Sequence, residues 1–128
     1  MSNLAPPPHL AYRRASVLAA TPGELVVMLY DGAMRFLHRG AVAMAEGQVE
    51  VAHNALRRGE RIIRHLDATL DFDQGELPQR LHAIYAFCLA HLSAARYAQD
   101  VGKIEEVGEL LGELRDAWSQ VAAEGEQD

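Results

Sequence analysis

The segment from Ala20 to Phe36, ATPGELVVMLYDGAMRF, opens with a strong helix start and continues as an unusually apolar helix. Thr21 is a favourable N-cap residue, and the proline after it takes the first helical position, where a missing N–H costs nothing. Glu24 follows three residues after Thr21, so its carboxylate can reach back to the cap and complete a capping box. These features predict a helix that begins at residue 22.

The apolar surface of this helix is wider than a surface helix needs. At about 100° per residue, its apolar side chains cover an arc of roughly 200°. An ordinary surface helix buries a stripe of about 100°, so the surplus must be buried in some other way. Two explanations stay open. Either an N-terminal segment and imperfect packing within the chain cover the surplus, or it lines a hydrophobic groove for a partner chain.

Helical periodicity and turn residues divide the rest of the chain into further helices. We predict helices at about residues 22–45, 48–71, 76–100 and 103–123. The last helix spaces its apolar residues alternately by three and four, which is typical of a seam in an antiparallel bundle. Short connections between helices of similar length predict an all-α fold, an antiparallel up-down-up-down four-helix bundle over residues 21–123.

The two ends of the chain are predicted to differ from the bundle. Residues 1–11 include three consecutive prolines and should be mobile or extended, and residues 124–128 should be mobile as well. The segment between residues 12 and 20 is too short to be stable alone, but it carries the apolar anchors Tyr12, Val17 and Leu18. We therefore expect it to dock on the bundle as a strap or a turn of helix.

The surplus of apolar surface recurs on helix 76–100, whereas helix 103–123 has a narrow stripe of roughly 120°. The broad helices 22–45 and 76–100 could therefore form a groove together. Glycines inside the predicted helices are a second clue, because each costs about 1 kcal/mol relative to alanine. They either permit close helix approach or soften the bundle for a ligand, and they are Gly32, Gly40, Gly59, Gly108 and Gly112.

Charge and cysteine content exclude several classes of protein. The formal net charge is −6, and residues 72–128 carry four basic against eleven acidic side chains, which argues against nucleic-acid binding. A single cysteine, Cys88, permits no internal disulfide, and its position on an apolar helix face predicts a buried core residue. No apolar run approaches the ~18 residues of a membrane span, and the start lacks the pattern of a cleaved signal. We expect a cytoplasmic protein without membrane insertion.

Enzymatic sites known from helical bundles are poorly matched. A di-metal bundle needs two Glu-x-x-His pairs and two more inward glutamates, but this chain has one pair, Glu50 with His53, off the apolar arc. We therefore predict no metal, no cofactor and no catalytic residue. A histidine phosphotransfer bundle is the alternative, with His53 as phosphoacceptor, Arg57 one turn later and Gly59 leaving room for the phosphoryl group. A general helical adaptor is another alternative.

The opening motif, taken with the rest of the chain, resembles the FliS family of flagellin-specific export chaperones. The specific matches are Thr21-Pro22-Gly23-Glu24-Leu25, Met28-Leu29-Tyr30-Asp31-Gly32 and Arg35-Phe36-Leu37, preceded by Tyr12. Weaker matches are Ile62-Ile63 through Leu66 to Leu70-Asp71, Leu81 with Ile84-Tyr85, and Glu113 to Trp118. The resemblance spans about Tyr12 to Val121 in the expected order.

This resemblance implies a cytoplasmic four-helix-bundle chaperone without enzymatic activity. Such a chaperone binds the disordered C-terminal segment of flagellin, prevents premature polymerisation and helps deliver flagellin to an export gate component of the flagellar secretion apparatus. The resemblance also implies that the N-terminal segment can cover part of the site when flagellin is absent. A homodimer of the free protein is left open.

We predict that the flagellin-binding surface is lined or supported by Tyr12, Leu25, Met28, Leu29, Tyr30, Ile84, Tyr85 and Leu89. Leu25, Leu29 and Ile84 lie nearest the core stripes, so a purely structural role stays open for them. Met28 stands alone on the polar side of its helix, which favours a functional role. The capping residues of the same motif are interpreted as fold specification.

Overall fold

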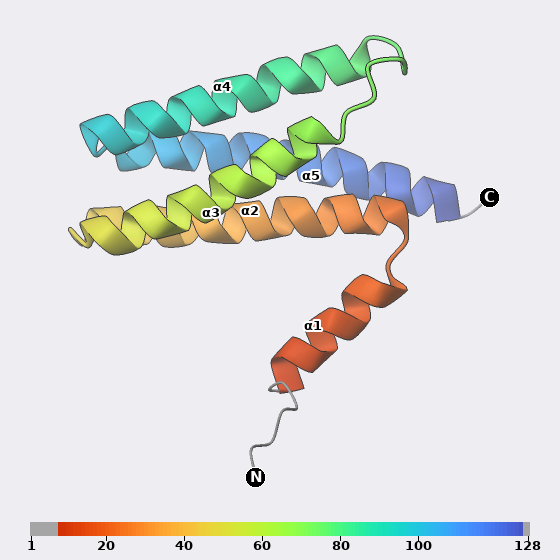
Figure 1. Cartoon of the computed structure of the whole chain (residues 1–128), viewed down its shortest axis with the longest axis horizontal. Coiled ribbons are helices and arrows are strands. Elements are labelled where there is room, and N and C mark those ends of the chain that lie inside the picture. The colour runs from red at the N-terminus through yellow and green to blue at the C-terminus, as the bar shows by residue number, and fades with distance from the viewer. Residues whose placement is uncertain (1–7, 127–128) are drawn as a thin grey trace.

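The computed structural model describes residues 8–126, apart from the side chains of residues 9, 10, 12, 13, 16, 125 and 126. Within this range the chain forms five helices and no strand (Figure 1), which confirms the all-α prediction. The helices are α1 (Pro8–Ala19), α2 (Pro22–Ala45), α3 (Val49–Ala68), α4 (Leu77–Ala98) and α5 (Val101–Glu126).

Helices α2 to α5 pack on one another in a cycle. The closely packed pairs among the described helices are α2–α3, α3–α4, α4–α5 and α2–α5. Helices α2 and α4 are not such a pair, so the two broadly apolar helices lie diagonally across the core. Each of them therefore faces two neighbours, and this double burial accounts for much of the apolar surplus seen in the sequence.

The core between these helices is apolar except at its centre. Tyr30 on α2 and Tyr85 on α4 are 0% and 2% exposed, and their hydroxyl oxygens lie 2.5 Å apart. Burial raises the pKa of both phenols, so each hydroxyl stays neutral and serves as the buried partner of the other. Around this pair lie fully buried side chains from all four helices, including Leu37, Leu56, Ile63, Leu92, Ile104 and Leu111.

Two glycines allow α2 and α3 to approach closely. A Cβ atom at Gly40 would lie 2.7 Å from Cδ2 of Leu56, and one at Gly59 would lie 2.9 Å from Cδ2 of Leu37. Real Cβ atoms essentially never make such short contacts, so a larger residue would force the buried leucine or the helices to shift. Close approach is therefore the correct explanation for these two glycines.

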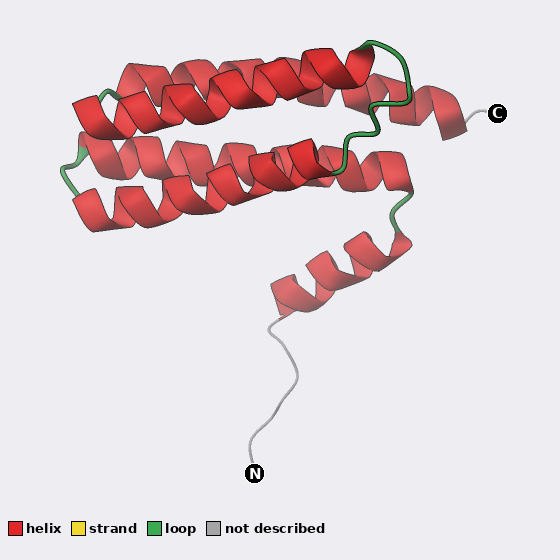
Figure 2. Ribbon diagram, turned by 45° about the horizontal axis from the view of Figure 1, so that its top comes forward, coloured by secondary structure: helices red, strands yellow, loops and turns green. Residues whose placement is uncertain are grey.

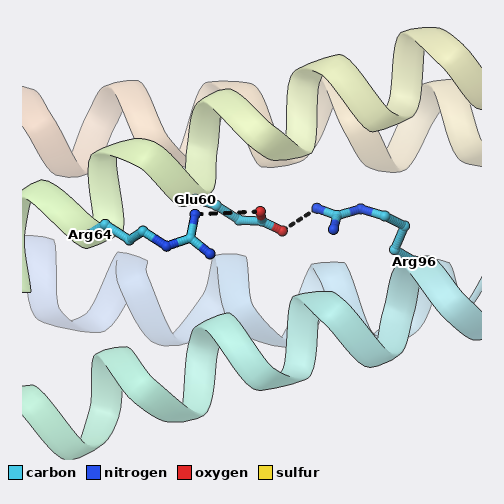
Figure 3. A network of polar contacts seen from close by, with 3 residues as sticks. All are labelled: Glu60, Arg64 and Arg96. Atoms are coloured by element: carbon cyan, nitrogen blue, oxygen red, sulfur yellow. Dashed lines mark hydrogen bonds and ion pairs between the residues drawn. The ribbon is translucent and has the colours of Figure 1, made fainter.

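Besides its apolar core contacts, helix α4 makes polar side-chain contacts with both of its neighbours. Glu60 on α3 is 5% exposed and accepts a hydrogen bond from the guanidinium of Arg96 on α4, while Arg64 approaches from one turn away at 3.9 Å (Figure 3). Because the carboxylate is buried, this pairing is what makes its charge tolerable in the interior. Two histidine–carboxylate pairs add to it, His82 with Asp67 at 2.7 Å and His91 with Glu106 at 2.5 Å.

Local signals position the start of α2 and the end of α3. Thr21 is extended and its hydroxyl accepts a hydrogen bond from the backbone N–H of Glu24 at 3.2 Å. Helix α3 ends at Ala68, three residues earlier than the sequence predicts, because a turn follows in which the Asp71 carboxylate accepts the N–H of Asp73. Helix α5 is longer than predicted at both ends, so residues 124–126 are helical.

Helix α1 stands apart from the packed helices, and only Ala20 and Thr21 connect it to α2 (Figure 2). Residues 8–11, which we expected to be mobile or extended, form its first turn. Val17 is 44% exposed and Leu18 is 81% exposed, so these two anchors are undocked in this conformation. The side chain of Tyr12 and the whole of residues 1–7 lie outside the part of the chain that the structure describes.

Candidate hydrophobic binding surface

Five of the predicted binding residues lie at or near the surface of the molecule. Leu25 is 37% exposed, and Met28 and Leu29 are half-buried in the first turns of α2. On α4, Ile84 and Leu89 are half-buried and pack against the core cluster. These side chains belong to two helices on opposite corners of the bundle, so they do not form one continuous patch.

The two predicted tyrosines are placed differently from what the sequence suggests. Tyr30 and Tyr85 are buried and bonded to each other, so a partner cannot touch Tyr30 without opening the core. Tyr85 also forms the inner wall of a cavity of about 270 Å³, together with Val26 of α2 and Trp118 of α5. Tyr30 and Tyr85 can therefore support a binding surface from the core, but they do not form its exposed face.

Helices α2 and α4 are not a closely packed pair among the described helices, so these two broadly apolar helices do not form adjacent walls of one groove. An open groove with a volume of about 610 Å³ lies between α2 and α5. Its walls are Met34, Leu37, His38, Ala41, Val42 and Ala45 on α2, and Val101, Ile104, Glu105, Gly108, Glu109 and Gly112 on α5.

The α2–α5 groove has an apolar floor and an acidic rim. Small residues lie along the floor on both helices, and Val42 is 43% exposed at the α2 wall. Glu105 and Glu109 stand one helical turn apart on the α5 wall, and both are exposed. This combination suits an amphipathic helix that lays an apolar face into the groove.

An ion pair links α2 and α5 one turn beyond this groove. Nε of Arg115 donates a hydrogen bond to Oδ1 of Asp31 at 2.9 Å, and this bond raises the pKa of Arg115. Both side chains are about one-third exposed, so the pair contributes little to stability. The ion pair nevertheless places the side chains of α2 and α5 in direct contact where the groove ends.

The residues of the catalytic alternatives lie elsewhere. His53 is half-buried in a cavity of about 360 Å³, with Glu50 beside it and Arg96 from α4. No group of three metal-ligating side chains gathers among the described residues. Cys88 is fully buried, and this burial raises its pKa to about 11, so the thiol is protonated and shielded at neutral pH.

Sequence reasoning missed the α5 wall of the groove. Helix α5 has a narrow apolar stripe, which directs attention toward the broader helices. The signal that could have found the groove was the pair Gly108 and Gly112, which interrupt a helix that is otherwise rich in helix formers.

The fold as a whole is similar to a solved structure described as the crystal structure of a flagellar chaperone from bacteria. The two chains superpose with a TM-score of 0.75 over 92% of this chain and 99% of the other, at 16% sequence identity. The architecture is therefore of the class seen in that flagellar chaperone.

The family model of the flagellar protein FliS matches residues 5–125. The flagellar secretion chaperone FliS of Bacillus subtilis is 34% identical, over 94% of this chain and 90% of the relative. The protein of the same name from Salmonella typhimurium is also 34% identical, over 84% and 82%. The chain belongs to the FliS family of flagellar secretion chaperones, which confirms the motif resemblance.

These relatives are named as chaperones, a non-catalytic class of protein. No helix within residues 8–126 has the length and apolar character that a membrane crossing requires.

Proposed function

We propose that this chain is a cytoplasmic chaperone that binds the disordered C-terminal segment of flagellin, prevents its premature polymerisation and aids its export. The observation that carries the proposal is the uncovered apolar groove of about 610 Å³ along α2 and α5, in a chain of the FliS family. The terminal segments of flagellin are amphipathic helices that otherwise join the filament core. A groove with an apolar floor is the complementary surface that such a helix needs.

The framework for binding is, in our proposal, an antiparallel up-down-up-down bundle of α2 to α5. The cyclic packing of neighbours and the short links after α2 and α4 support this arrangement. The export gate component is the second proposed partner, and it receives the loaded chaperone.

Helix α1 is proposed to act as a strap that competes with flagellin for the surface near Leu25, Met28 and Leu29. Support comes from its exposed Val17 and Leu18 and from its two-residue connection to α2. A strap that occupies the site for part of the time lowers the apparent affinity for the client by the fraction of closed molecules. Release of flagellin at the export gate is easier when the affinity is moderated in this way.

The primary test is a calorimetric titration of the full chain with a peptide of the flagellin C-terminal segment from the same bacterium. We expect one-to-one binding, and we expect flagellin that lacks this segment not to form a complex. Absence of binding by the full chain would contradict the proposal. Acid-labile phosphate on His53 after incubation with acetyl phosphate would point to the phosphotransfer alternative instead.

Deletion of residues 1–18 tests the strap. Among the described residues, the core contains no side chain from α1, so the remaining bundle should stay folded. We expect the truncated chain to bind the peptide more tightly than the full chain. Unchanged affinity would contradict competition, and weaker binding would indicate that α1 clamps the bound client.

A further inference from the structure

One glycine inside α5 is not explained by packing within the chain. Glycine is the least favourable residue in a helix interior apart from proline, so each such glycine needs a reason. Contacts with Leu56 and Leu37 supply the reason for Gly40 and Gly59. A Cβ atom at Gly108, by contrast, would meet no described atom within 4 Å, although Gly108 is half-buried.

The open space above Gly108 is the α2–α5 groove. Gly108 forms part of its α5 wall, and Ala41 and Ala45 are on the α2 wall. Such small side chains allow a third helix to come close to the backbones of α2 and α5, because interaxial distances depend on the side chains at the crossing. A bulky residue at 108 would be tolerated by the bundle and would occupy the groove.

The charges on the groove point to one kind of occupant. Glu105 and Glu109 flank Gly108 on the α5 wall, and among the described residues neither forms an ion pair. The polar group on the opposite wall is His38. A helix that lies in this groove therefore places one flank beside two carboxylates, and basic side chains on that flank complement them.

Helix α1 of the same chain is too short to be this occupant. It has 12 residues and is about 18 Å long, and it joins α2 through two residues. Folded back along α2 from Pro22, it reaches about as far as Met34, where the groove begins. The groove therefore remains open when α1 covers the first turns of α2, and a partner chain has to fill it.

We infer that an amphipathic client helix lies in this groove and comes closest to α5 at Gly108. The client helix has a small residue at that crossing point, and its basic side chains face Glu105 and Glu109. This inference rests on the proposed function and deepens it, because it names the chemistry that the client must present. Gly108 is thus a specificity-determining position, which excludes helices with a bulky residue at the crossing, and the two glutamates select against acidic flanks.

The test uses the full chain and the flagellin C-terminal peptide, with affinities measured by titration calorimetry. Gly108→Leu should weaken binding by at least about tenfold, because the leucine fills the groove, whereas Gly108→Ala should change it by less than about threefold. Ala117→Leu is the matched control, since it adds the same side chain to an exposed position of α5 outside the groove. Thermal unfolding and circular dichroism of each variant verify that the bundle is intact.

The charge arm compares two double variants of equal net charge. Glu105→Gln with Glu109→Gln should weaken binding about three- to tenfold at about 50 mM salt, and the difference should shrink at about 500 mM salt as the charges are screened. Glu113→Gln with Glu124→Gln removes two exposed charges from α5 outside the groove and should leave the affinity unchanged.

The outcomes separate this inference from the proposed function. Wild-type affinity in both Gly108→Leu and the Glu105/Glu109 variant would overturn the inference while leaving flagellin binding intact. Tighter binding by Gly108→Leu would mean that the chain's own N-terminal segment occupies the groove, which also overturns it. Loss of a homodimer in Gly108→Leu, with unchanged client affinity, would assign the groove to a second copy and overturn it too. A wild-type chain that binds no flagellin peptide would contradict the proposed function itself.

Discussion

Helix α2 has two long seams, and they differ at their glycines. On the α3 side, Gly40 and Gly59 are pressed against leucine side chains at distances that leave no room for a Cβ atom. On the α5 side, Gly108 faces open space. The same residue type therefore closes one seam and keeps the other open.

This contrast teaches that the cost of a helical glycine does not reveal its purpose. A glycine costs about 1 kcal/mol of helix stability in either case, but its structural consequence differs. Along α3 the glycines allow dense packing, which stabilises the fold. Along α5 the glycine leaves open a groove of about 610 Å³, which contributes to stability only when a partner fills it.

The largest predicted effect comes from making the same substitution on both seams. Gly40→Leu should reduce the free energy of unfolding by about 3 kcal/mol, because its side chain overlaps the buried Leu56. Gly108→Leu should change stability by less than about 1 kcal/mol, since its helix propensity improves and nothing blocks it. Urea unfolding of both variants measures the difference. Equal losses would mean that the α5 seam is as tightly closed as the α3 seam.

A second prediction extends the comparison to the α3–α4 seam, where a charge pair replaces glycine. Arg96→Ala should cost about 2–3 kcal/mol, because it leaves the buried carboxylate of Glu60 without its main partner (Figure 3). Arg80→Ala is the control, since Arg80 pairs with Glu76 on the surface of the same helix and should cost no more than about 0.5 kcal/mol. If both variants lose the same small amount, the Glu60 site is effectively solvated.

A third prediction concerns the core that the seams enclose. Burial raises the pKa of Cys88 to about 11, whereas an exposed thiol titrates near 9. The unfolded chain therefore releases this proton first, and stability should fall by about 2 kcal/mol as pH rises from about 9 to about 11. Cys88→Ala should remove that part of the pH dependence, measured as the change in unfolding free energy between pH 9 and pH 10. An identical slope in the variant would show that the thiol is accessible to water in the folded state.

The smallest predicted effect is at the buried pair of hydroxyls of Tyr30 and Tyr85. Tyr30→Phe should cost about 1 kcal/mol, because the hydroxyl of Tyr85 loses its buried partner. The double variant Tyr30→Phe with Tyr85→Phe should cost no more than the single one, since both hydroxyls are then absent. Additive losses in this double-mutant cycle would mean that the two hydroxyls do not interact.

Much of the fold could be predicted because its signals are local. The cap at Thr21 needs only three residues of context, and the structure contains the hydrogen bond from Glu24 that the pattern predicts. The end of α3 was placed too late because Asp71 forms a turn that competes with helix continuation.

The site was harder to predict because helical wheels give directions without neighbours. Tyr30 and Tyr85 lie within wide apolar arcs, and nothing in their spacing indicates that they point at each other across the diagonal. Sequential helices with short links are neighbours in a bundle, so the first and third long helices have to be diagonal. That topological argument would have redirected the search for a groove from α2 and α4 to α2 and α5.

Helix α1 shows where local reasoning stops. The apolar residues Val17 and Leu18 indicate a segment that needs a partner surface, but no spacing in the sequence names that surface. Both side chains are exposed in the structure beside a two-residue link, and the deletion of residues 1–18 tests whether they dock.

The buried hydroxyl pair also has a consequence for helix alignment. Apolar contacts are non-directional, whereas a hydrogen bond needs two particular atoms at a fixed separation. A slip of one residue moves a helix by about 1.5 Å along its axis and turns it by about 100°. Such a slip would separate the hydroxyls of Tyr30 and Tyr85, which now lie 2.5 Å apart, and leave both unpaired in the core. The hydrogen bond between the two tyrosines therefore fixes the axial register of α2 relative to α4, while α5 packs against both helices.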